Sequence, residues 1–312
     1  MTAVTAARGG GRQGGGDQLR AGASTGAIRF VWAQLAVLGA VAAAWASSPV
    51  AAASWLGALA VLVLCLGRWR RRWLSEWVAR YAAFLVRRKR RGALLDVVAP
   101  GAWVEGDHVH GPGGVVAVLR PRLAAPRVLA GLAGPDVLVV LHVGRGQVRR
   151  PRAWVVARAA RTPELWHDDE VVRVLGNATR RTRRELRRLG VTADLLAEED
   201  LVTTIAALGH VTGQREVRED WKYWHSGPVA QACFRLPAAT ARAAVDWLLT
   251  AAPGVAVTVA LTADDAVLRV AGAAEAAVEA AVGVLAAHVR LERLDGLHAR
   301  GVAASLLIGG VL

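Results

Sequence analysis

Two apolar segments lie close together near the start of the chain, residues 30–46 and 50–67, and only Ser47-Ser48-Pro49 separates them. A bilayer core of roughly 30 Å requires about 20 apolar helical residues, with about 17 as the short limit. Both segments reach that limit, and a proline after two serines breaks a helix. The pattern predicts a transmembrane hairpin over residues 28–67. Residues 1–27, rich in small residues, are expected to form a disordered tail.

Positive charge flanks this pair of segments on both sides. Four arginines precede it, an arginine cluster follows it, and the short connection carries no charge. Lys and Arg accumulate on the cytoplasmic side of membrane spans, so we expect a two-pass plasma-membrane protein with both termini cytoplasmic. Ala44-Trp45-Ala46 resembles a signal-peptidase site, but a second apolar segment follows at once, which favours an uncleaved hairpin.

A basic, tryptophan-rich stretch over residues 68–91 follows the second apolar segment. No proline or glycine interrupts it, and its aromatic residues recur every fourth position: Trp69, Trp73, Trp77 and Tyr81. This spacing predicts a helical extension with the rings along one face. Two interpretations stay open. The stretch either anchors at lipid headgroups, with Arg70, Arg71 and Arg72 contributing, or docks on a neighbouring membrane subunit.

Strand and helix patterns alternate over residues 92–312, which predicts a cytosolic mixed α+β domain. The second half, 229–308, has the order β-α-β-β-α-β of ferredoxin-like folds. Its expected elements are strand 229–236, helix 240–251, strands 255–261 and 267–271, helix 274–290 and strand 301–308. The first half is similar in rhythm, with strands at 114–119, 137–143 and 154–158 and helices at 122–132, 168–189 and 192–208. Whether this region is one domain or a duplicated unit stays open.

Charge and cysteine content restrict the partners. The chain carries a formal charge of +14, of which residues 1–91 hold +12 and the remainder only +2. A near-neutral soluble region argues against nucleic acid, whereas basic residues beside a span favour anionic membrane lipids. Cys65 and Cys233 lie in different predicted elements and fit a reducing compartment.

The predicted helix 168–189 has two contrasting faces. An apolar stripe consists of Val171, Leu175, Ala178, Thr182, Leu186 and Leu189. Arginines cover the opposite face, and we single out Arg180, Arg184 and Arg188 as candidates for contact with an acidic partner or the membrane. A solvated helix face is the simpler alternative.

Motifs for catalysis are absent from the sequence, which contains no phosphate-binding loop, no dinucleotide fingerprint and no nucleophile elbow. The best metal candidate comprises Glu105, Asp107, His108 and His110, but the glycines that follow predict an exposed polar turn. Asp168-Asp169 and Asp264-Asp265 stand at a helix start and a turn, where Asp is favoured for local hydrogen bonds. We therefore expect no catalytic residue, metal site or cofactor.

One late segment, from Arg218 to Gly227, places Trp221, Tyr223 and Trp224 among charged residues. Large aromatic side chains are often buried at a sheet edge, and they are also enriched where subunits meet. Trp221 and Trp224 are accordingly candidates either for the core or for a subunit interface.

These features together resemble the EccE family, the conserved membrane component of actinobacterial type VII (ESX) secretion systems. The resemblance rests on the hairpin, the basic exit, the stretch from Arg218 to Leu236, and the ending from Leu294-Asp295-Gly296 to Val302-Ala303-Ala304-Ser305. It implies a subunit at the periphery of a hexameric translocon, with EccB, EccC, EccD and a mycosin-type protease as partners. EccC is the ATPase of that machine, and the family supplies no catalytic residues.

The sequence thus predicts a non-catalytic structural subunit that contributes to assembly or stability of a type VII secretion translocon. The main alternative is a membrane-anchored transferase that uses a nucleotide- or lipid-linked donor. Saturable nucleotide-sugar binding with a divalent ion would favour the transferase, whereas co-purification with an EccC-type ATPase would favour the subunit. A lipid-binding scaffold that acts alone is a third possibility, and the mass of the detergent-solubilised complex distinguishes it.

Overall fold

A computed structural model describes residue 34 and residues 49–69, 72–87, 92–122, 124–146, 150–211 and 216–310. The chain divides into two compact units, Met1–Ala82 and Ala83–Leu312. The predicted tail and, apart from residue 34, the first predicted apolar span lie outside the described residues.

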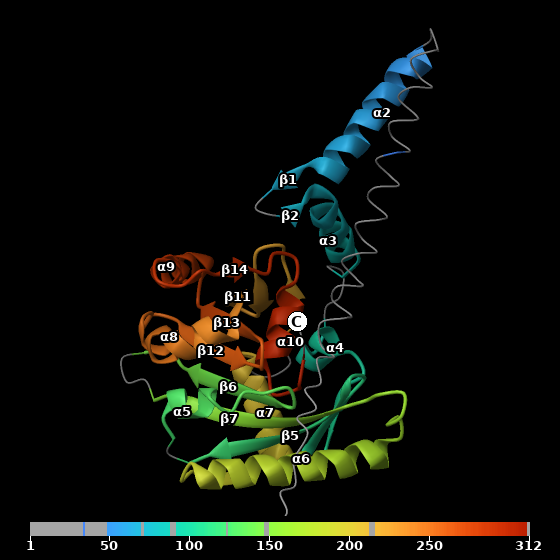
Figure 1. Cartoon of the computed structure of the whole chain (residues 1–312). Helices are drawn as coiled ribbons and strands as arrows, with labels where there is room; N and C mark the ends of the chain where they lie inside the picture. Colours follow the sequence, from blue (N-terminus) through green and yellow to red (C-terminus); the bar gives the residue numbers. More distant parts are fainter. Residues whose placement is uncertain are drawn as a thin grey trace, which may run out of the picture. The chain divides into compact units, whose positions relative to one another are not determined.

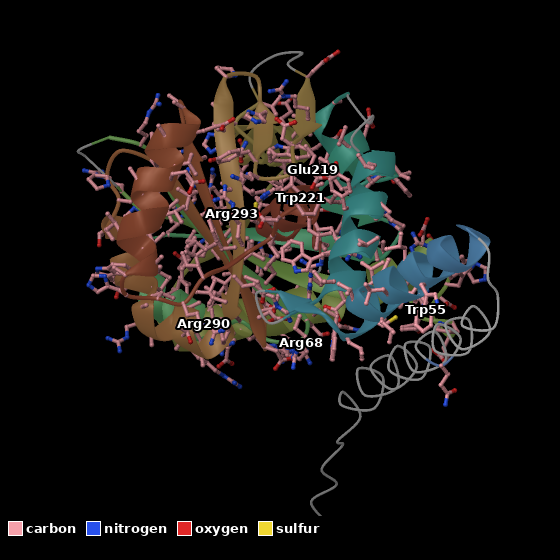
Figure 2. The ribbon with its side chains drawn as sticks, turned by 90° about the horizontal axis from the view of Figure 1, so that it is seen from above. Trp55, Arg68, Glu219, Trp221, Arg290 and Arg293 are labelled. Atoms are coloured by element: carbon pink, nitrogen blue, oxygen red, sulfur yellow. The ribbon has the colours of Figure 1, made fainter. Side chains whose placement is uncertain are left out.

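The first unit contains an apolar helix and a short strand ladder (Figure 1). Helix α2 spans Pro49–Leu66 and begins at a proline, whose fixed φ suits the first helical turn. Trp55 lies on this helix and Arg68 on strand β1 (Arg68–Trp69), which pairs antiparallel with β2 (Arg72–Trp73) (Figure 2). Helix α3 follows as Leu74–Arg87. Among the residues described, none of the helices combines the length and the apolar character that crossing a bilayer demands.

The predicted uninterrupted helix over residues 68–91 is wrong at its start. Helix α2 ends just before Gly67, and the strands β1 and β2 follow. The Gly67 carbonyl then accepts a hydrogen bond from the Leu74 amide at 2.9 Å, at the start of α3. Glycine is a common helix terminator, and like charges four residues apart, as at Arg68 and Arg72, destabilise a helix. Trp69 and Trp73 therefore lie in a strand pair, whereas Trp77 and Tyr81 lie in helix α3.

An antiparallel sheet organises the second unit (Figure 1). The strands are β3 (Trp103–Glu105), β4 (His108–Gly111), β5 (Gly114–Pro121), β6 (Val137–Val143), β7 (Arg152–Ala160), β8 (Ala193–Leu195), β9 (Val217–Glu219), β10 (Trp224–Ser226), β11 (Val229–Pro237), β12 (Ala256–Leu261), β13 (Asp265–Gly272) and β14 (Glu292–Arg293). The helices are α4 (Leu94–Val98), α5 (Pro126–Ala130), α6 (Asp168–Arg188), α7 (Glu198–Leu208), α8 (Ala238–Thr250), α9 (Glu275–Ala286) and α10 (His298–Ser305). In the described part of the chain, the sheet order is β3-β4-β5-β7-β6-β12-β13-β11-β10-β9, with β8 beside β5 and β14 beside β11.

The two halves of this unit repeat one topology. The order β3-β4-β5-α5-β6-β7-α6-β8-α7 recurs as β9-β10-β11-α8-β12-β13-α9-β14-α10. In each half the third strand pairs with the second, fifth and sixth strands. Equivalent strands β6 and β12 join the halves antiparallel, with Leu141 opposite Val259, as an approximate twofold relation requires. The topology is therefore that of a duplicated unit, the alternative that the sequence left open.

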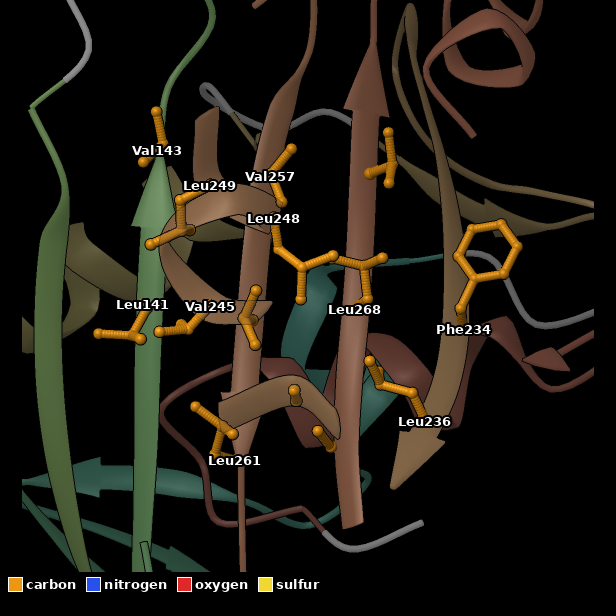
Figure 3. Close-up of a cluster of buried hydrophobic side chains, with 14 of the residues drawn as sticks. Leu141, Val143, Phe234, Leu236, Val245, Leu248, Leu249, Val257, Leu261 and Leu268 are labelled. Atoms are coloured by element: carbon orange, nitrogen blue, oxygen red, sulfur yellow. The ribbon is translucent and has the colours of Figure 1, made fainter. Parts of the chain in front are cut away.

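Helices cover both faces of the sheet, and the apolar core lies in two layers. One layer packs α5, α6, α8 and α9 against the sheet, and the other packs α4, α7 and α10 against it. Figure 3 shows Val245 and Leu248 of α8 in the same apolar cluster as Val257 and Leu268 of the sheet. Complete burial of such a side chain stabilises the fold by about 1.5–3 kcal/mol. These layers fix the strands whose ends carry the candidate sites.

The long periodic elements agree with the sequence patterns, and the short ones do not. Strand 137–143 is confirmed as β6, and helix 168–189 as α6, which ends at Arg188 and leaves Leu189 exposed. The predicted strand 301–308 is wrong, because α10 occupies most of it and the sixth strand is β14. A short run of alanine and valine does not distinguish a buried helix from a strand. The helix predicted from residue 192 is wrong at its start, where β8 pairs with β5.

Candidate partner-binding surfaces

The first unit holds the aromatic and basic candidates near the exit from α2. The Arg68 guanidinium lies 4.8 Å from the ring centroid of Trp73, a cation–π distance. Trp77 is half-buried in α3. The candidates Arg70 and Arg71, and the side chains of Trp69 and Arg72, lie outside the described residues. The structure thus brings Arg68 and Trp73 together, and the proposed docking face stays a prediction.

Helix α6 turns an arginine-rich face to solvent. Arg180, Arg184 and Arg188 are exposed, whereas Val171 and Leu186 on the opposite face are fully buried. Arg180 donates to Asn177 Oδ1 at 2.6 Å, and Arg188 donates to Glu185 Oε2 at 3.0 Å. Exposed pairs of this kind contribute about 1 kcal/mol at most. They leave this face positively charged and suited to an acidic partner or an anionic surface.

Trp221 and Trp224 have different environments. Trp224 in β10 is completely buried, and its Nε1 donates to Ser226 Oγ at 3.2 Å. Trp221 is half-buried, and its ring meets that of Phe84, at the end of α3, edge to face with the centroids 5.4 Å apart. Trp224 is therefore part of the sheet core, and Trp221 connects the end of α3 to the body of the second unit.

A tight turn of the chain receives the Trp221 ring. The Gly296 amide donates to the Trp221 carbonyl at 2.8 Å. Gly296 has a φ of 66°, and a Cβ added there would lie 2.4 Å from Cζ3 of Trp221. Only glycine satisfies both conditions without strain. The two stretches that support the family resemblance, around Trp221 and around Gly296, are thus in direct contact (Trp221 is labelled in Figure 2).

Arg87 fastens the same region through charge. Its Nη2 donates to the Gly296 carbonyl at 2.6 Å, and its Nε lies 3.7 Å from Glu219 Oε2. Glu219 is buried, and its Oε1 accepts a hydrogen bond from the Ala299 amide in the first turn of α10 at 3.0 Å. Burial raises the pKa of the Glu219 carboxyl, while the bond from Ala299 and the charge of Arg87 oppose this rise. A buried carboxylate needs such partners. We call Phe84, Arg87, Glu219, Trp221 and Gly296 the Trp221 corner.

Arg293 extends the corner toward α9. Its Nη1 donates to Glu279 Oε1 at 2.6 Å, and the Tyr223 hydroxyl donates to the same oxygen at 2.6 Å. The guanidinium also lies 4.9 Å from the Tyr223 ring centroid. These contacts join Tyr223, two residues after Trp221, to Arg293 and Glu279, so the corner is a fixed part of the fold.

The metal candidate forms a β-hairpin and not the exposed turn that the sequence predicted, because His108 and His110 lie in β4. His108 Nδ1 lies 2.9 Å from Asp107 Oδ1, and the His110 ring stacks on Trp103 with centroids 5.0 Å apart. His110 Nε2 lies 3.8 Å from Glu105 Oε2. In the ranges that the structure covers, no three His, Cys, Asp or Glu side chains are grouped so as to hold a metal ion.

Asp168, Asp265 and Cys233 have structural environments. Asp168 pairs with Arg161, and Asp265 accepts two hydrogen bonds from Arg235, at 3.0 and 2.6 Å. Burial raises the pKa of the Cys233 thiol to about 12, so this cysteine is protonated and part of the packing. Each of these three residues thus contributes an ion pair or apolar packing to the fold.

Sequence reasoning missed three members of the Trp221 corner. The sequence showed Phe84 only as part of the aromatic and basic stretch, and Arg87 only as the first residue of a basic run. Gly296 was noted only as part of the ending that resembles the family. Arg87 and Gly296 are 209 residues apart in sequence. Local patterns carry no signal for such a contact, although a glycine after Asp295 indicates a turn.

Comparison with known proteins gives one family. Residues 150–236 match the family model described as "Putative type VII ESX secretion system translocon, EccE". The matched segment runs from the start of β7 through α6 and α7 to β11, and it includes the arginine face, Trp221 and Trp224. No curated protein matches the chain. Over residues 150–236 the chain is thus similar to the EccE family of type VII secretion components, which confirms the family resemblance that its sequence indicates.

Proposed function

We propose that this protein is a non-catalytic structural subunit of a type VII secretion membrane complex. The observation that carries the proposal is the match of residues 150–236 to the EccE family, a type VII translocon component. The same segment contains the exposed arginine face of α6 and the Trp221 side of the corner. The arginine face of α6 would contact an acidic or anionic neighbour, and the Trp221 corner would brace the second unit internally.

The Trp221 corner supports a bracing role for the second unit. An aromatic pair, an ionic contact with the buried Glu219 and a glycine with positive φ together fix the end of α3 to the sheet. These contacts lie within the second unit and brace its α+β body at the residues where α3 ends. In such a subunit, the apolar and aromatic contacts would supply the binding energy, and the charged rim would set the register.

The membrane part of the proposal rests on the sequence pattern. We propose a two-pass hairpin over residues 28–67 with both termini cytoplasmic, and contacts of the basic stretch with anionic lipids. EccB, EccC, EccD and a mycosin-type protease are the proposed partners. Their contact faces on this chain would include the aromatic candidates Trp73 and Trp77.

Co-purification tests the function. The tagged full-length protein, expressed with its neighbouring secretion components and solubilised in mild detergent, should carry an EccC-type ATPase with it in one large assembly. The transferase alternative instead requires saturable binding of a nucleotide sugar with a divalent ion. A full-length protein that migrates alone, without the ATPase, would refute the proposal.

A matched pair of variants tests the bracing role. Trp221→Ala should lower the yield of the assembly about fivefold or more, because it removes the ring that packs edge to face on Phe84 and covers Gly296. Trp103→Ala removes an equally large ring that also stacks on a neighbour, but outside the matched segment. This control should retain the assembly, and an equal loss in both variants would reduce the effect to general destabilisation.

A further inference from the structure

A basic cavity of about 530 Å³ opens where the ends of several strands meet the end of α7. Its lining includes His142 of β6, Arg145, Arg150, Arg152 and His210. Among the described residues that line it, none carries a negative charge. The volume lies within the range of small-molecule sites, about 300–1,000 Å³. Small residues at strand ends, Gly272 among them, complete the wall and leave room for a ligand.

A buried arginine, Arg269, interacts electrostatically with His210 of the cavity lining, and no carboxylate among the described residues forms an ion pair with it. Arg269 of β13 is 1% exposed, and its Nη1 donates to Gln231 Oε1 at 3.0 Å. Its Nε and Nη2 have no hydrogen-bond partner among the residues that the structure describes. Burial lowers the pKa of the guanidinium to about 10, so it remains charged at neutral pH. An uncompensated buried charge costs several kcal/mol, which an anion beside it would offset.

His210 connects Arg269 with the cavity. It lines the cavity, and burial together with the charges of Arg269 and Arg145 lowers its pKa to about 4. Its φ of 55° lies in the left-handed region, and its buried Nε2 has no partner within the described ranges. Strained backbone of this kind is concentrated at functional sites. The His142 ring lies 6.1 Å away, with its Nδ1 held 2.9 Å from Thr258 Oγ1.

We propose that this cavity binds a small phosphorylated ligand. The phosphoryl group would approach His210, close to the charge of Arg269, and the remaining negative charge would face Arg145, Arg150 and Arg152. Guanidinium groups bind phosphate oxygens through paired, charge-assisted hydrogen bonds. Several cations around one cavity favour a multiply charged phosphate over a single carboxylate. The assignment is independent of the structural role in secretion.

Calorimetric titration of the detergent-solubilised full-length protein with inorganic pyrophosphate tests the site. One molecule should bind per chain, and citrate should bind more weakly. Arg145→Gln with Arg150→Gln, two exposed positions on the cavity, should weaken binding at least tenfold, because each variant removes a charge-assisted hydrogen bond to phosphate. Arg180→Gln with Arg184→Gln removes equal charge from α6 and should change affinity less than twofold.

Three results would overturn the site: no binding of pyrophosphate, tighter binding of citrate, or equal weakening by the two double variants. His210→Asn provides a buried-side test that keeps the left-handed backbone accessible. It should weaken pyrophosphate binding severalfold while the melting temperature without ligand changes little, and unchanged affinity would contradict the proposal. Competition by short-chain phosphatidic acid would identify a lipid headgroup as the source of the phosphoryl group, and lack of competition would identify a soluble ligand.

Discussion

The packing of the Trp221 corner restricts which residue fits at position 296. Gly296 combines a positive φ with a ring directly above it, so Gly296→Ala should lower the free energy of unfolding by about 3 kcal/mol, from left-handed strain plus displacement of Trp221. Gly101 has a similar φ of 77° with open space around it, and Gly101→Ala should cost only about 1 kcal/mol. Denaturant unfolding of the full chain measures both. Equal losses would show that the Trp221 contact contributes nothing.

Two histidines with lowered pKa values, His298 and His210, make stability depend on pH. Burial lowers the pKa of His298 to about 3 and that of His210 to about 4, from about 6.5 in an unfolded chain. His298 Nδ1 accepts a hydrogen bond from the Cys233 amide, which requires the neutral ring. Between pH 6.5 and 4 the unfolded chain therefore binds more protons than the folded chain. The free energy of unfolding should fall as pH decreases through this window, by up to about 2.7 kcal/mol per pH unit for two groups.

Unfolding measured at pH 7.5, 6 and 5 checks this dependence. His210→Asn should reduce the slope by about one proton. His167→Gln alters an exposed histidine at the start of α6 and should leave the slope unchanged. A slope that His210→Asn does not alter would contradict burial of a neutral imidazole.

Elements differ in how strongly their own sequence specifies them. The period of α6 and the apolar run of β6 are visible locally, and both were predicted closely. The short strands β8 and β14 exist because β5 and β11 offer them an edge. Helix α10 is buried at His298 and from Gly301 to Ser305, so it lacks the broad polar face that identifies a helix in a sequence. Pairing partners far away in the chain therefore decided the short elements.

The exposed face of α6 yields a prediction at the scale of the element. Replacement of Arg180, Arg184 and Arg188 by Gln should lower co-purification with the secretion components about fivefold at low salt. The free energy of unfolding should change by no more than about 0.5 kcal/mol, as is usual for surface positions. The difference from wild type should shrink in about 1 M salt, where the screening length is about 3 Å.

A second triple variant separates the face from total charge. Gln at Arg127, Arg290 and Arg300 removes three exposed positive charges from other parts of the second unit. This variant should co-purify as wild type does. If both triple variants lose partners equally, the α6 face is only a solvated helix surface.

The whole molecule consists of two units, and the larger is a duplication joined at one strand pair. Because β6 and β12 pair antiparallel, one sheet runs through both halves. The basic cavity lies beside this pair of strands, and His142 and Ala256 line it. Duplication supplies the scaffold, whereas the arginines that line the cavity, Arg145, Arg150 and Arg152, all come from the first half. The candidate ligand site is thus a property of the assembled sheet.

Topology is the prediction that belongs to the whole chain. A reporter fused after Leu312 should be active in the cytoplasm, and the purified protein should retain residues before Ala46. A reporter active only outside the plasma membrane, or a mature chain that begins after Ala46, would contradict the two-pass arrangement. A reporter in the connection at residues 47–49 should give the opposite signal.

The sequence by itself determined the features that depend on neighbours along the chain. Apolar runs, the two faces of α6, the β-α-β-β-α order and the family resemblance are all local patterns, and the resemblance is confirmed over residues 150–236. Gly67 also indicates a helix end, but the tryptophan spacing favoured a continuous helix after it. Local periodicity reports burial and hydrogen bonding within one element, so these conclusions needed no partner.

Only the tertiary structure decided which distant residues meet. The sheet order, the joining of two similar halves, the Trp221 corner and the placement of Arg269 near His210 all arise from contacts between remote segments. Trp221 and Trp224 stand three residues apart with similar neighbours, yet one is core and the other joins an incoming helix. The cause is physical: burial and compensation of charge depend on what packs against a side chain, and local sequence does not contain that information.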